Sequence, residues 1–436
     1  MVVFNWLDHY QNNICTADEA VKAIRSKDYV IVSHACGEPR SLTRAMSERY
    51  ADLRDVKVVH RVGMGECLYA QPGMEEHFRH ISLFGGVNTR KAIYEGRADY
   101  IPRFISETPS LFLEGHIPVD VALITVSPPD KFGYCSLGIS VDYSLPAARM
   151  AKIVIAEVNS NMPRTLGDSF ISVKDINHFV LSDFPLMEVA PTIQTDIEIQ
   201  IGNYCADLIE DGCTLQMGIG AIPDAALAAM VNKKDLGIHT EMFSDGLIPL
   251  VEQGVINGSK KTLHPYKIIS TFMMGTKALY DWVDDNPLVE MHPENYINDP
   301  WIIAQNYKVV SINSALQIDV LGQISADAIG PKQFSGVGGQ VDFIRGAKRS
   351  VGGGKSIIAV PSTASRGTVS RIVPALYEGT AVTTTRNEVD YVITEYGVAQ
   401  LAGKTNLQRL NALVSISHPD FRDEIMFKAK KLYYGA

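Results

Sequence analysis

Glu241 is the residue of this sequence whose neighbours best fit a chemical role. It lies in the run of residues 239–246, about twenty residues after a glycine loop at residues 218–224. A carboxylate that faces backbone N–H groups can form an acyl anhydride, and the N–H groups can stabilise the oxyanion formed on the way. Neither feature decides the question alone, because a glutamate is almost always exposed or paired.

The glycine loop places Gly218 and Gly220 between a predicted strand, residues 215–217, and a helix expected to begin near Pro223. Glycines permit backbone conformations closed to other residues and let a ligand approach the amides, and a proline in the first helical turn removes no needed donor. Such a loop can bind a phosphate or an oxyanion, or it can be an ordinary tight turn. It is not the GxGxxG dinucleotide fingerprint, because Pro223 and Asp224 stand where a third glycine is needed.

A second glycine cluster lies at residues 334–343, where Gly338 and Gly339 belong to a set of three glycines within four residues. So many glycines carry an entropic cost that an ordinary turn does not require, and we interpret the segment as a functional loop. The glycine run at residues 352–354 is instead predicted to be a flexible surface hairpin. A carboxylate is a weak nucleophile toward a thioester, so two donor loops near Glu241, at about 3 kcal/mol per donor, would meet the need for oxyanion stabilisation.

Other polar residues have competing interpretations. Asn298 precedes Asp299, and this pair is typical of a helix start with Asp299 as N-cap, although a catalytic asparagine is the alternative. Glu395 follows a predicted strand and either enters a site or stabilises a helix N-terminus. His34 and His239 are predicted to be packed, hydrogen-bonded histidines rather than acid–base groups.

The elements that must position these residues are those of an α/β protein. Short apolar runs alternate with helical stretches, which predicts largely parallel sheets with crossover helices. A helix is expected over residues 196–209. The predicted strands are residues 29–32, 56–59, 121–126, 153–156, 215–217, 308–312, 356–360 and 391–394.

Segments of the two halves correspond in order, at offsets near 180 to 190 residues, as an internal duplication would produce. The matching pairs are residues 39–46 with 223–230, His60 with His239, and residues 130–136 with 319–325. The boundary is expected within residues 183–194, which gives an N-terminal domain of residues 1–187 and a C-terminal domain of residues 188–436. The first-copy counterpart of Glu241 is Val62, so only the second copy carries the carboxylate.

Bulk composition limits the class of protein. A chain of 436 residues exceeds the size at which single cores stop growing, so two or three domains are expected, and a hydrophobic fraction of 46% with 20% charged residues is typical of a folded globular protein. The net charge of -9 argues against a nucleic-acid surface.

The start of the chain has no signal-peptide pattern, and no apolar run has the length of a membrane span. Six scattered cysteines without a CxxC indicate reduced thiols in a cytoplasmic protein, and no ligand spacing supports a zinc site or another metal site.

The motifs together resemble the acetyl-CoA hydrolase/transferase family of class I CoA-transferases over nearly the whole chain. The segments that carry the resemblance are residues 15–20, 126–130, 218–224, 239–246, 332–343, 384–387 and 418–421. The resemblance implies two similar open α/β domains of the CoA-transferase type with the active site between them. It also implies that Glu241 attacks an acyl-CoA thioester and becomes a glutamyl-CoA thioester in a ping-pong reaction.

The resemblance further implies roles for other residues. Asn298 and Glu395 match polar positions of the substrate pocket near the nucleophile. The positions expected to bind CoA and supply oxyanion donors are Gln216, Met217, Gly218, Ile219, Gly220, Ala221, Gly338 and Gly339.

The implied partners are an acyl-CoA and a short-chain carboxylate, with 4-hydroxybutyrate first and butyrate or acetate close behind. Coenzyme A is then a substrate, with no permanently bound cofactor, no metal and no ATP, and relatives suggest a homodimer or a dimer of dimers. Two alternatives stay open: an acyl-CoA hydrolase that uses the same glutamate, and a non-enzymatic metabolite sensor, since fold does not determine function.

Overall fold

The structure is a computed structural model, and it describes residues 5–435. The chain divides into two compact units. The first comprises Met1–Val189 and Ile269–Ile297, and the second comprises Ala190–Ile268 and Asn298–Ala436. The first change of unit lies within the expected range of residues 183–194, two residues after the end of the expected N-terminal domain. The segment Ile269–Ile297 then returns to the first unit.

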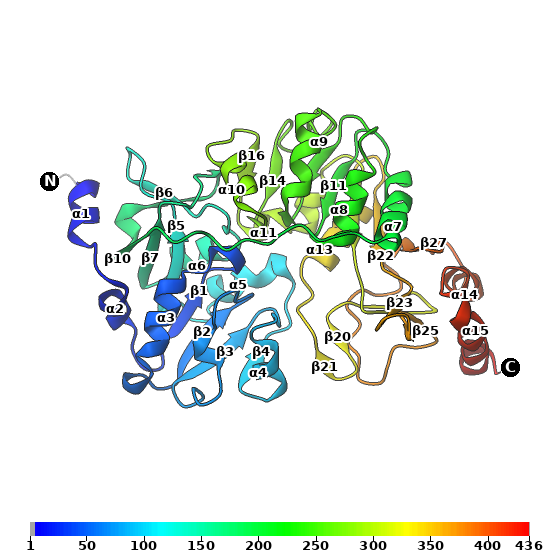
Figure 1. The fold of residues 1–436 in the computed structure, drawn as a ribbon, viewed down its shortest axis with the longest axis horizontal. Coiled ribbons are helices and arrows are strands. Elements are labelled where there is room, and N and C mark those ends of the chain that lie inside the picture. Colours follow the sequence, from blue (N-terminus) through cyan, green and yellow to red (C-terminus); the bar gives the residue numbers. More distant parts are fainter. Residues whose placement is uncertain (1–4, 436) are drawn as a thin grey trace. The chain divides into compact units, whose positions relative to one another are not determined.

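The first unit contains a seven-stranded sheet with strand order β10-β7-β5-β1-β2-β3-β4, and every pairing in it is parallel (Figure 1). Parallel neighbours require crossover connections, which accounts for the helices between the strands. The strands are β1 (Tyr29–Val32), β2 (Val56–His60), β3 (Phe78–Ser82), β4 (Ala98–Tyr100), β5 (Val121–Val126), β7 (Ile153–Asn159) and β10 (His178–Ser182).

Alternating side chains of these strands form two cores, one on each face of the sheet. Val30 and Val58 pack with residues of α2 (Ala17–Ala20) and α3 (Arg40–Glu48). Ile31 and Val59 pack with residues of α5 (Thr108–Leu113) and α6 (Ser144–Met150) on the opposite face. A sheet buried on both faces explains why its strands are continuous apolar runs in the sequence.

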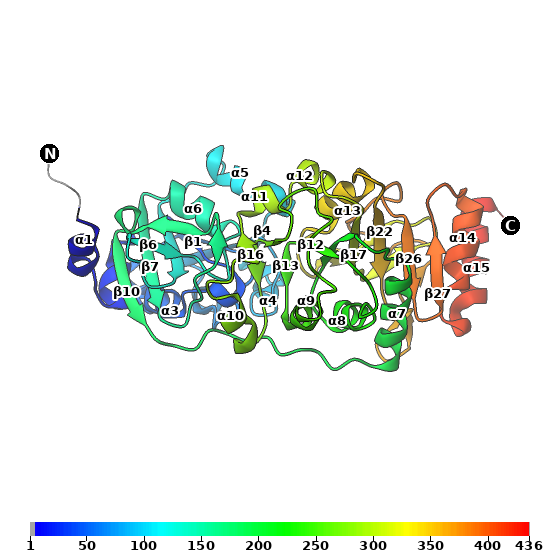
Figure 2. The ribbon, with the colours of Figure 1, turned by 90° about the horizontal axis from the view of Figure 1, so that it is seen from above.

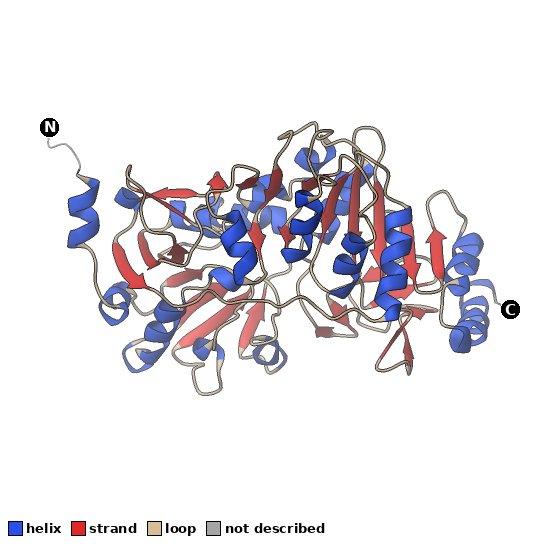
Figure 3. Ribbon diagram, turned by 45° about the horizontal axis from the view of Figure 1, so that its top comes forward, coloured by secondary structure: helices blue, strands red, loops and turns tan. Residues whose placement is uncertain are grey.

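The sheet of the second unit follows the order β27-β26-β22-β17-β11-β12, parallel except for the antiparallel pair of β26 and β27. Figure 3 shows strands lying side by side with helices beside them. The strands are β11 (Thr214–Met217), β12 (Gly237–His239), β17 (Val309–Asn313), β22 (Lys355–Ala359), β26 (Tyr391–Thr394) and β27 (Gly397–Gln400).

Helices cover both faces of this second sheet (Figure 2). The helices α7, α8 and α9 lie on one face, α12 and α13 lie on the other, and α14 packs beside α15 beyond β27. Their bounds are α7 (Asp196–Asp207), α8 (Ala221–Ala228), α9 (Ile248–Glu252), α12 (Pro300–Ala304), α13 (Gln340–Lys348), α14 (Asn406–Ser415) and α15 (Pro419–Tyr434). The second unit is therefore a three-layer α/β structure.

The internal duplication predicted from the sequence is visible in the strand order. The order β10-β7-β5-β1-β2 of the first unit matches β26-β22-β17-β11-β12 of the second, strand for strand in chain order. The turn after the third matched strand is also repeated: Asp130 accepts hydrogen bonds from the amides two and four residues on, and Asp319 does the same. Gly133 and Gly322 occupy these turns at φ +80° and +93°, which favours glycine. Two α/β domains of one design are thus confirmed.

The eight strands predicted from apolar runs are all present, with ends shifted by a few residues in some of them. The helix after the first glycine loop begins at Ala221, two residues before Pro223 and therefore near the expected start. One local expectation was wrong. Residues 352–354 form a turn from α13 into β22 rather than a flexible hairpin, and a Cβ on Gly354 would overlap the carbonyl oxygens of Ala347 and Val309.

Within residues 5–435, no helix combines the length and the apolar character needed to cross a bilayer.

Candidate active site

Glu241 and the first glycine loop follow adjacent parallel strands of the second unit. The loop follows β11 and Glu241 follows β12, and the two strands pair in register with Leu215 opposite Ile238. Both therefore lie at the carboxyl edge of the sheet, which is where open α/β sheets bind ligands. The side chain of Glu241 is partly exposed at this edge.

Asn298 and Gly339 meet the Glu241 carboxylate from two other segments of the second unit. Asn298 is fully buried, and its Nδ2 donates a hydrogen bond of 2.9 Å to Glu241 Oε2. A Cβ on Gly339 would overlap both Glu241 Oε2 and Asn298 Nδ2, so only glycine fits at that position. Asn298 also precedes the predicted N-cap, since Asp299 accepts a hydrogen bond from the Trp301 amide at the start of α12.

The second glycine loop leads directly into α13, whose N-terminus carries the positive end of the helix dipole. Gly339 is the N-cap residue, and no side chain of the described residues caps the helix there. Gly338 adopts φ +62°, a conformation that favours glycine. The arrangement leaves backbone donors beside the carboxylate, as an anion or an oxyanion requires.

The first glycine loop is open to a ligand. Gly220 adopts φ +111°, and a Cβ on Gly218 or Gly220 would meet no described atom within 4 Å. A pocket of about 300 Å³ adjoins the loop and is lined in part by Gly218, Ile219 and Ala221. The backbone is therefore accessible where the resemblance implied contact with CoA.

Gln216 and Met217 lie at the carboxyl end of β11, and both are buried. Gln216 Oε1 accepts hydrogen bonds from Ser311 Oγ at 2.6 Å and from Asn313 Nδ2 at 3.3 Å, both on β17. Sequence reasoning missed Ser311 and Asn313. Their position at the end of the predicted strand 308–312, the same sheet edge as Gln216, was the signal that would have found them.

Glu395 lies at the carboxyl end of β26 and accepts hydrogen bonds from Ser362, at 2.8 Å from its amide and 2.6 Å from its hydroxyl. Three strands stand between β26 and β12 in the sheet, which separates Glu395 from Glu241 by roughly 19 Å along the edge. The structure thus brings Asn298 and Gly339 to Glu241 and leaves Glu395 on a different part of the same edge.

Other polar groups considered in the sequence have structural roles. Asp224, in the first turn of α8, accepts a hydrogen bond of 3.5 Å from Ser244 Oγ in the run after Glu241, and burial raises the pKa of Asp224. His239 is fully buried, with Nδ1 3.2 Å from Asn306 Nδ2. In the first unit, His34 Nδ1 lies 3.3 Å from Asp142 Oδ2. The prediction of packed, hydrogen-bonded histidines is confirmed.

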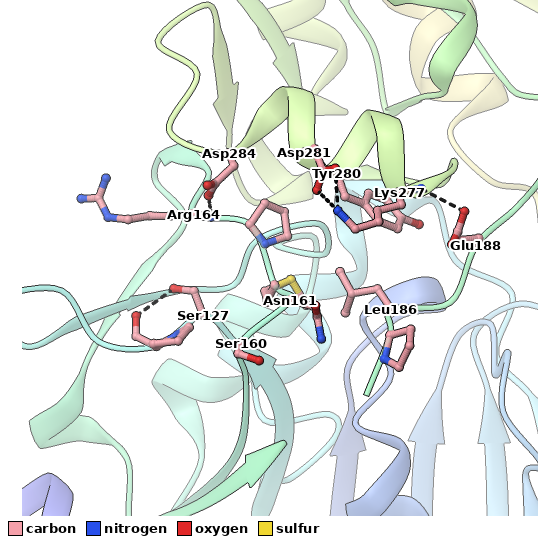
Figure 4. Close-up of a pocket in the computed structure, with 14 residues that line it drawn as sticks. Ser127, Ser160, Asn161, Arg164, Leu186, Glu188, Lys277, Tyr280, Asp281 and Asp284 are labelled. Atoms are coloured by element: carbon pink, nitrogen blue, oxygen red, sulfur yellow. Dashed lines mark hydrogen bonds and ion pairs between the residues drawn. The ribbon is translucent and has the colours of Figure 1, made fainter. Parts of the chain in front are cut away.

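The first unit contains a larger pocket, of about 600 Å³, at the carboxyl ends of β5 and β7 (Figure 4). Its charged lining residues have partners: Lys277 pairs with Asp281 at 2.6 Å, and Asp284 accepts a hydrogen bond from the Arg164 amide. The Arg164 guanidinium pairs with Asp285, which does not line the pocket. None of the predicted site residues lines this pocket.

Comparison with known proteins identifies the family. The model of the acetyl-CoA hydrolase/transferase N-terminal domain matches residues 5–196, and that of the C-terminal domain matches residues 275–429. The chain belongs to the acetyl-CoA hydrolase/transferase family. The resemblance inferred from the motifs is therefore confirmed.

Several relatives are named as CoA-transferases. A 4-hydroxybutyrate coenzyme A transferase of Clostridium kluyveri is 56% identical over 98% of this chain and all of the relative. A succinyl-CoA:acetate/propanoyl-CoA:succinate CoA transferase of Fasciola hepatica is 46% identical over 94% of this chain and 86% of the relative. The crystal structure of 4-hydroxybutyrate CoA-transferase from Porphyromonas gingivalis, 43% identical, superposes with a TM-score of 0.85 over 98% of this chain and all of that one. The chain is an enzyme of the CoA-transferase class.

Proposed function

We propose that this protein transfers CoA between a short-chain acyl-CoA and a carboxylic acid through a glutamyl-CoA thioester on Glu241. The main support is the contact of the Glu241 carboxylate with Asn298 Nδ2 and with Gly339, in a chain of this family. A carboxylate held by a buried amide, beside the N-terminus of α13, is fixed in place and faces donors suited to an oxyanion.

The proposed reaction begins when a Glu241 carboxylate oxygen attacks the thioester carbonyl carbon. The C–S bond breaks, CoA leaves as its thiolate, and a mixed anhydride forms. The thiolate then attacks the Glu241 carbonyl carbon of the anhydride, which releases the first acid as a carboxylate and leaves a glutamyl-CoA thioester. No proton is gained or lost in these steps.

The second acid reverses the sequence. Its carboxylate attacks the Glu241 carbonyl carbon and expels the CoA thiolate, which then attacks the acyl carbon of the new anhydride. A new acyl-CoA leaves, and the Glu241 carboxylate is regenerated. Thioester and carboxylate are exchanged for their equivalents, so the reaction needs no external energy source, and CoA binding energy can stabilise the transition states.

We propose 4-hydroxybutyrate or butyrate as the acyl group and acetate as the second acid, with CoA as a substrate rather than a bound cofactor. The names of the relatives support this choice, since they include 4-hydroxybutyrate and acetate. Pockets that differ by one methylene discriminate by only about 1 to 3 kcal/mol, so activity with neighbouring short-chain acids is expected.

The test is release of CoA from butyryl-CoA with and without acetate. Transfer predicts that acetate accelerates consumption of butyryl-CoA and that acetyl-CoA appears in equal amount. A rate indifferent to acetate, with free CoA as the product, would contradict transfer and would support the hydrolase that the family also contains.

A further inference from the structure

Thr240 lies between the buried His239 and the nucleophile Glu241. The hydrogen bonds of its side chain have no role in the reaction proposed above. Its hydroxyl oxygen lies 3.0 Å from the carbonyl oxygen of Met217 and 2.9 Å from that of Met242, and it accepts a hydrogen bond of 3.4 Å from the Met217 amide. Only 2% of Thr240 is exposed, so water does not compete for these contacts.

The two backbone partners of this hydroxyl adjoin the two segments that carry the chemistry. Met217 immediately precedes Gly218 of the first glycine loop, and Met242 immediately follows Glu241. The paired register of β11 and β12 ends with Leu215 opposite Ile238, two residues before Met217 and Thr240. The Thr240 side chain therefore joins the strands beyond their last backbone pair, where they diverge into the loops.

We propose that Thr240 is a positioning residue that sets the distance between the glycine-loop donors and the Glu241 carboxylate. A single hydroxyl that bonds to both segments restricts their relative movement more than separate contacts would. Misplacement of reacting groups by about 1 Å can cost about 100-fold in rate, so a small displacement at this hydroxyl has a large effect.

The first copy supports a specific role for this hydroxyl rather than a general requirement of the fold. The matched position there is Arg61, which follows His60 as Thr240 follows His239. Arg61 points into a buried ion pair with Glu294 instead of bridging two strands through its side chain. The same strand arrangement thus forms without a hydroxyl, and the hydroxyl occurs in the copy that carries the carboxylate.

The inference rests on the proposed function, and its test separates the two. Butyryl-CoA is mixed with enzyme in the absence of a second acid, and the rate at which CoA becomes thioester-linked to Glu241 is followed by quenching and mass spectrometry. The KM for butyryl-CoA and the midpoint of thermal unfolding are measured for each variant. Thr240→Val removes the hydroxyl at nearly constant volume, and Thr240→Ser keeps it.

Thr214→Val is the matched control, because Thr214 is a fully buried threonine on β11 whose hydroxyl has no hydrogen-bond partner among the described residues. We expect Thr240→Val to slow thioester formation by about 10- to 100-fold with KM within about threefold of wild type, because placement rather than binding is lost. Thr240→Ser and Thr214→Val should stay within about threefold of the wild-type rate. If Thr240→Val does not fold, Thr240→Cys replaces the hydroxyl by a weak donor and should show the same loss.

Thioester formation at the wild-type rate in Thr240→Val or Thr240→Cys would overturn the positioning role. An equal loss of that rate in Thr240→Ser, which keeps the hydroxyl, would also overturn it. Neither result affects the proposed function, because wild-type enzyme still forms the thioester. Absence of the thioester from wild-type enzyme would instead contradict the proposed function itself.

Discussion

At the scale of single residues, the central feature is a carboxylate that accepts a hydrogen bond from a buried amide. Asn298 is fully buried, and its Nδ2 donates to Glu241 Oε2, which constrains the side chain. Hydrogen bonds to charged groups contribute about 1.5 to 3 kcal/mol, enough to hold one rotamer.

Replacement of the nucleophile is the first prediction at this scale. Glu241→Ala should abolish CoA transfer to acetate, because no other group can carry the intermediate, while the midpoint of thermal unfolding changes little at this partly exposed position. Undiminished transfer in this variant would refute the assignment of the nucleophile.

Removal of the fixing amide should have a smaller effect. Asn298→Ala removes the hydrogen bond to Glu241 Oε2, and we expect turnover with butyryl-CoA and acetate to fall about 10- to 100-fold because the carboxylate is less well placed. Steady-state kinetics measures this directly. Asn257→Ala, in an exposed loop of the same unit, is the control that should keep wild-type turnover. Equal turnover in both variants would show that Asn298 does not position Glu241.

At the scale of elements, two glycine segments and two strand ends assemble the site. Gly339 is the closest of these contacts, since a Cβ there would overlap Glu241 Oε2 and Asn298 Nδ2. Glycine is therefore required at position 339 for steric reasons. At position 353 glycine is favoured by the backbone conformation instead, because φ is +83° and a Cβ there would meet no described atom within 4 Å.

This difference predicts opposite outcomes for two alanine substitutions. Gly339→Ala should reduce CoA transfer by at least about 100-fold, because either the carboxylate or α13 must move. Gly353→Ala should keep transfer activity and lower the free energy of unfolding by about 1 kcal/mol, the usual effect of a side chain at positive φ. Activity assays and urea unfolding of both variants provide the comparison, and full activity in Gly339→Ala would contradict the contact.

The elements themselves were largely predictable from the sequence, because continuous apolar runs are typical of strands buried on both faces. The strand of residues 121–126 is one such case, and β5 has these bounds. The contact of Asn298 with Glu241 was not predictable from periodicity, since 57 residues separate them and loop geometry decides where each side chain points. Thr240 was missed for a related reason: its hydroxyl bonds to backbone groups, which leave no pattern of residue types.

At the scale of the whole molecule, the chain does not divide into two units at one point. The segment Ile269–Ile297 belongs to the first unit although it follows a long stretch of the second. A buried ion pair fixes this segment. Arg61 Nη1 and Nη2 bind the Glu294 carboxylate at 2.5 and 2.7 Å, and Arg61 Nη2 also donates to Thr108. Glu294 lies in α11 (Glu294–Ile297), and neither partner is more than 2% exposed.

Breaking this pair should destabilise the first unit. Arg61→Met leaves Glu294 as an uncompensated buried charge, and the free energy of unfolding in urea should fall by about 3 to 5 kcal/mol. The double variant Arg61→Met with Glu294→Leu removes both charges and should recover a large part of that loss. If Arg61→Met were as stable as wild type, the ion pair of Arg61 and Glu294 would not anchor the segment Ile269–Ile297.

The buried rings of His60 and His80 in the first unit should make stability depend on pH. Burial lowers the pKa of His60 and of His80 to about 3, so both rings stay neutral in the folded protein. Unfolded histidine titrates near pH 6.5, so the unfolded chain takes up protons first as pH falls, and stability is lost between pH 6.5 and 3.

The expected loss is about 2 kcal/mol per histidine at pH 5 relative to pH 8. Urea unfolding across this range measures it. His80→Gln, which does not titrate, should lose less stability on acidification than wild type, by about that amount. An identical pH dependence in the two proteins would show that the ring of His80 is not held neutral by burial.

Detection of CoA bound to Glu241 tests the proposed reaction most directly. Enzyme is incubated with butyryl-CoA in the absence of any second acid and digested under mildly acidic conditions, and the peptide that contains Glu241 is weighed by mass spectrometry, with Glu241→Ala as the control. We expect the mass of a CoA thioester on that peptide, its loss on addition of acetate, and acetyl-CoA as the product. Transfer of CoA to acetate with no adduct on Glu241, or undiminished in Glu241→Ala, would contradict the proposed reaction.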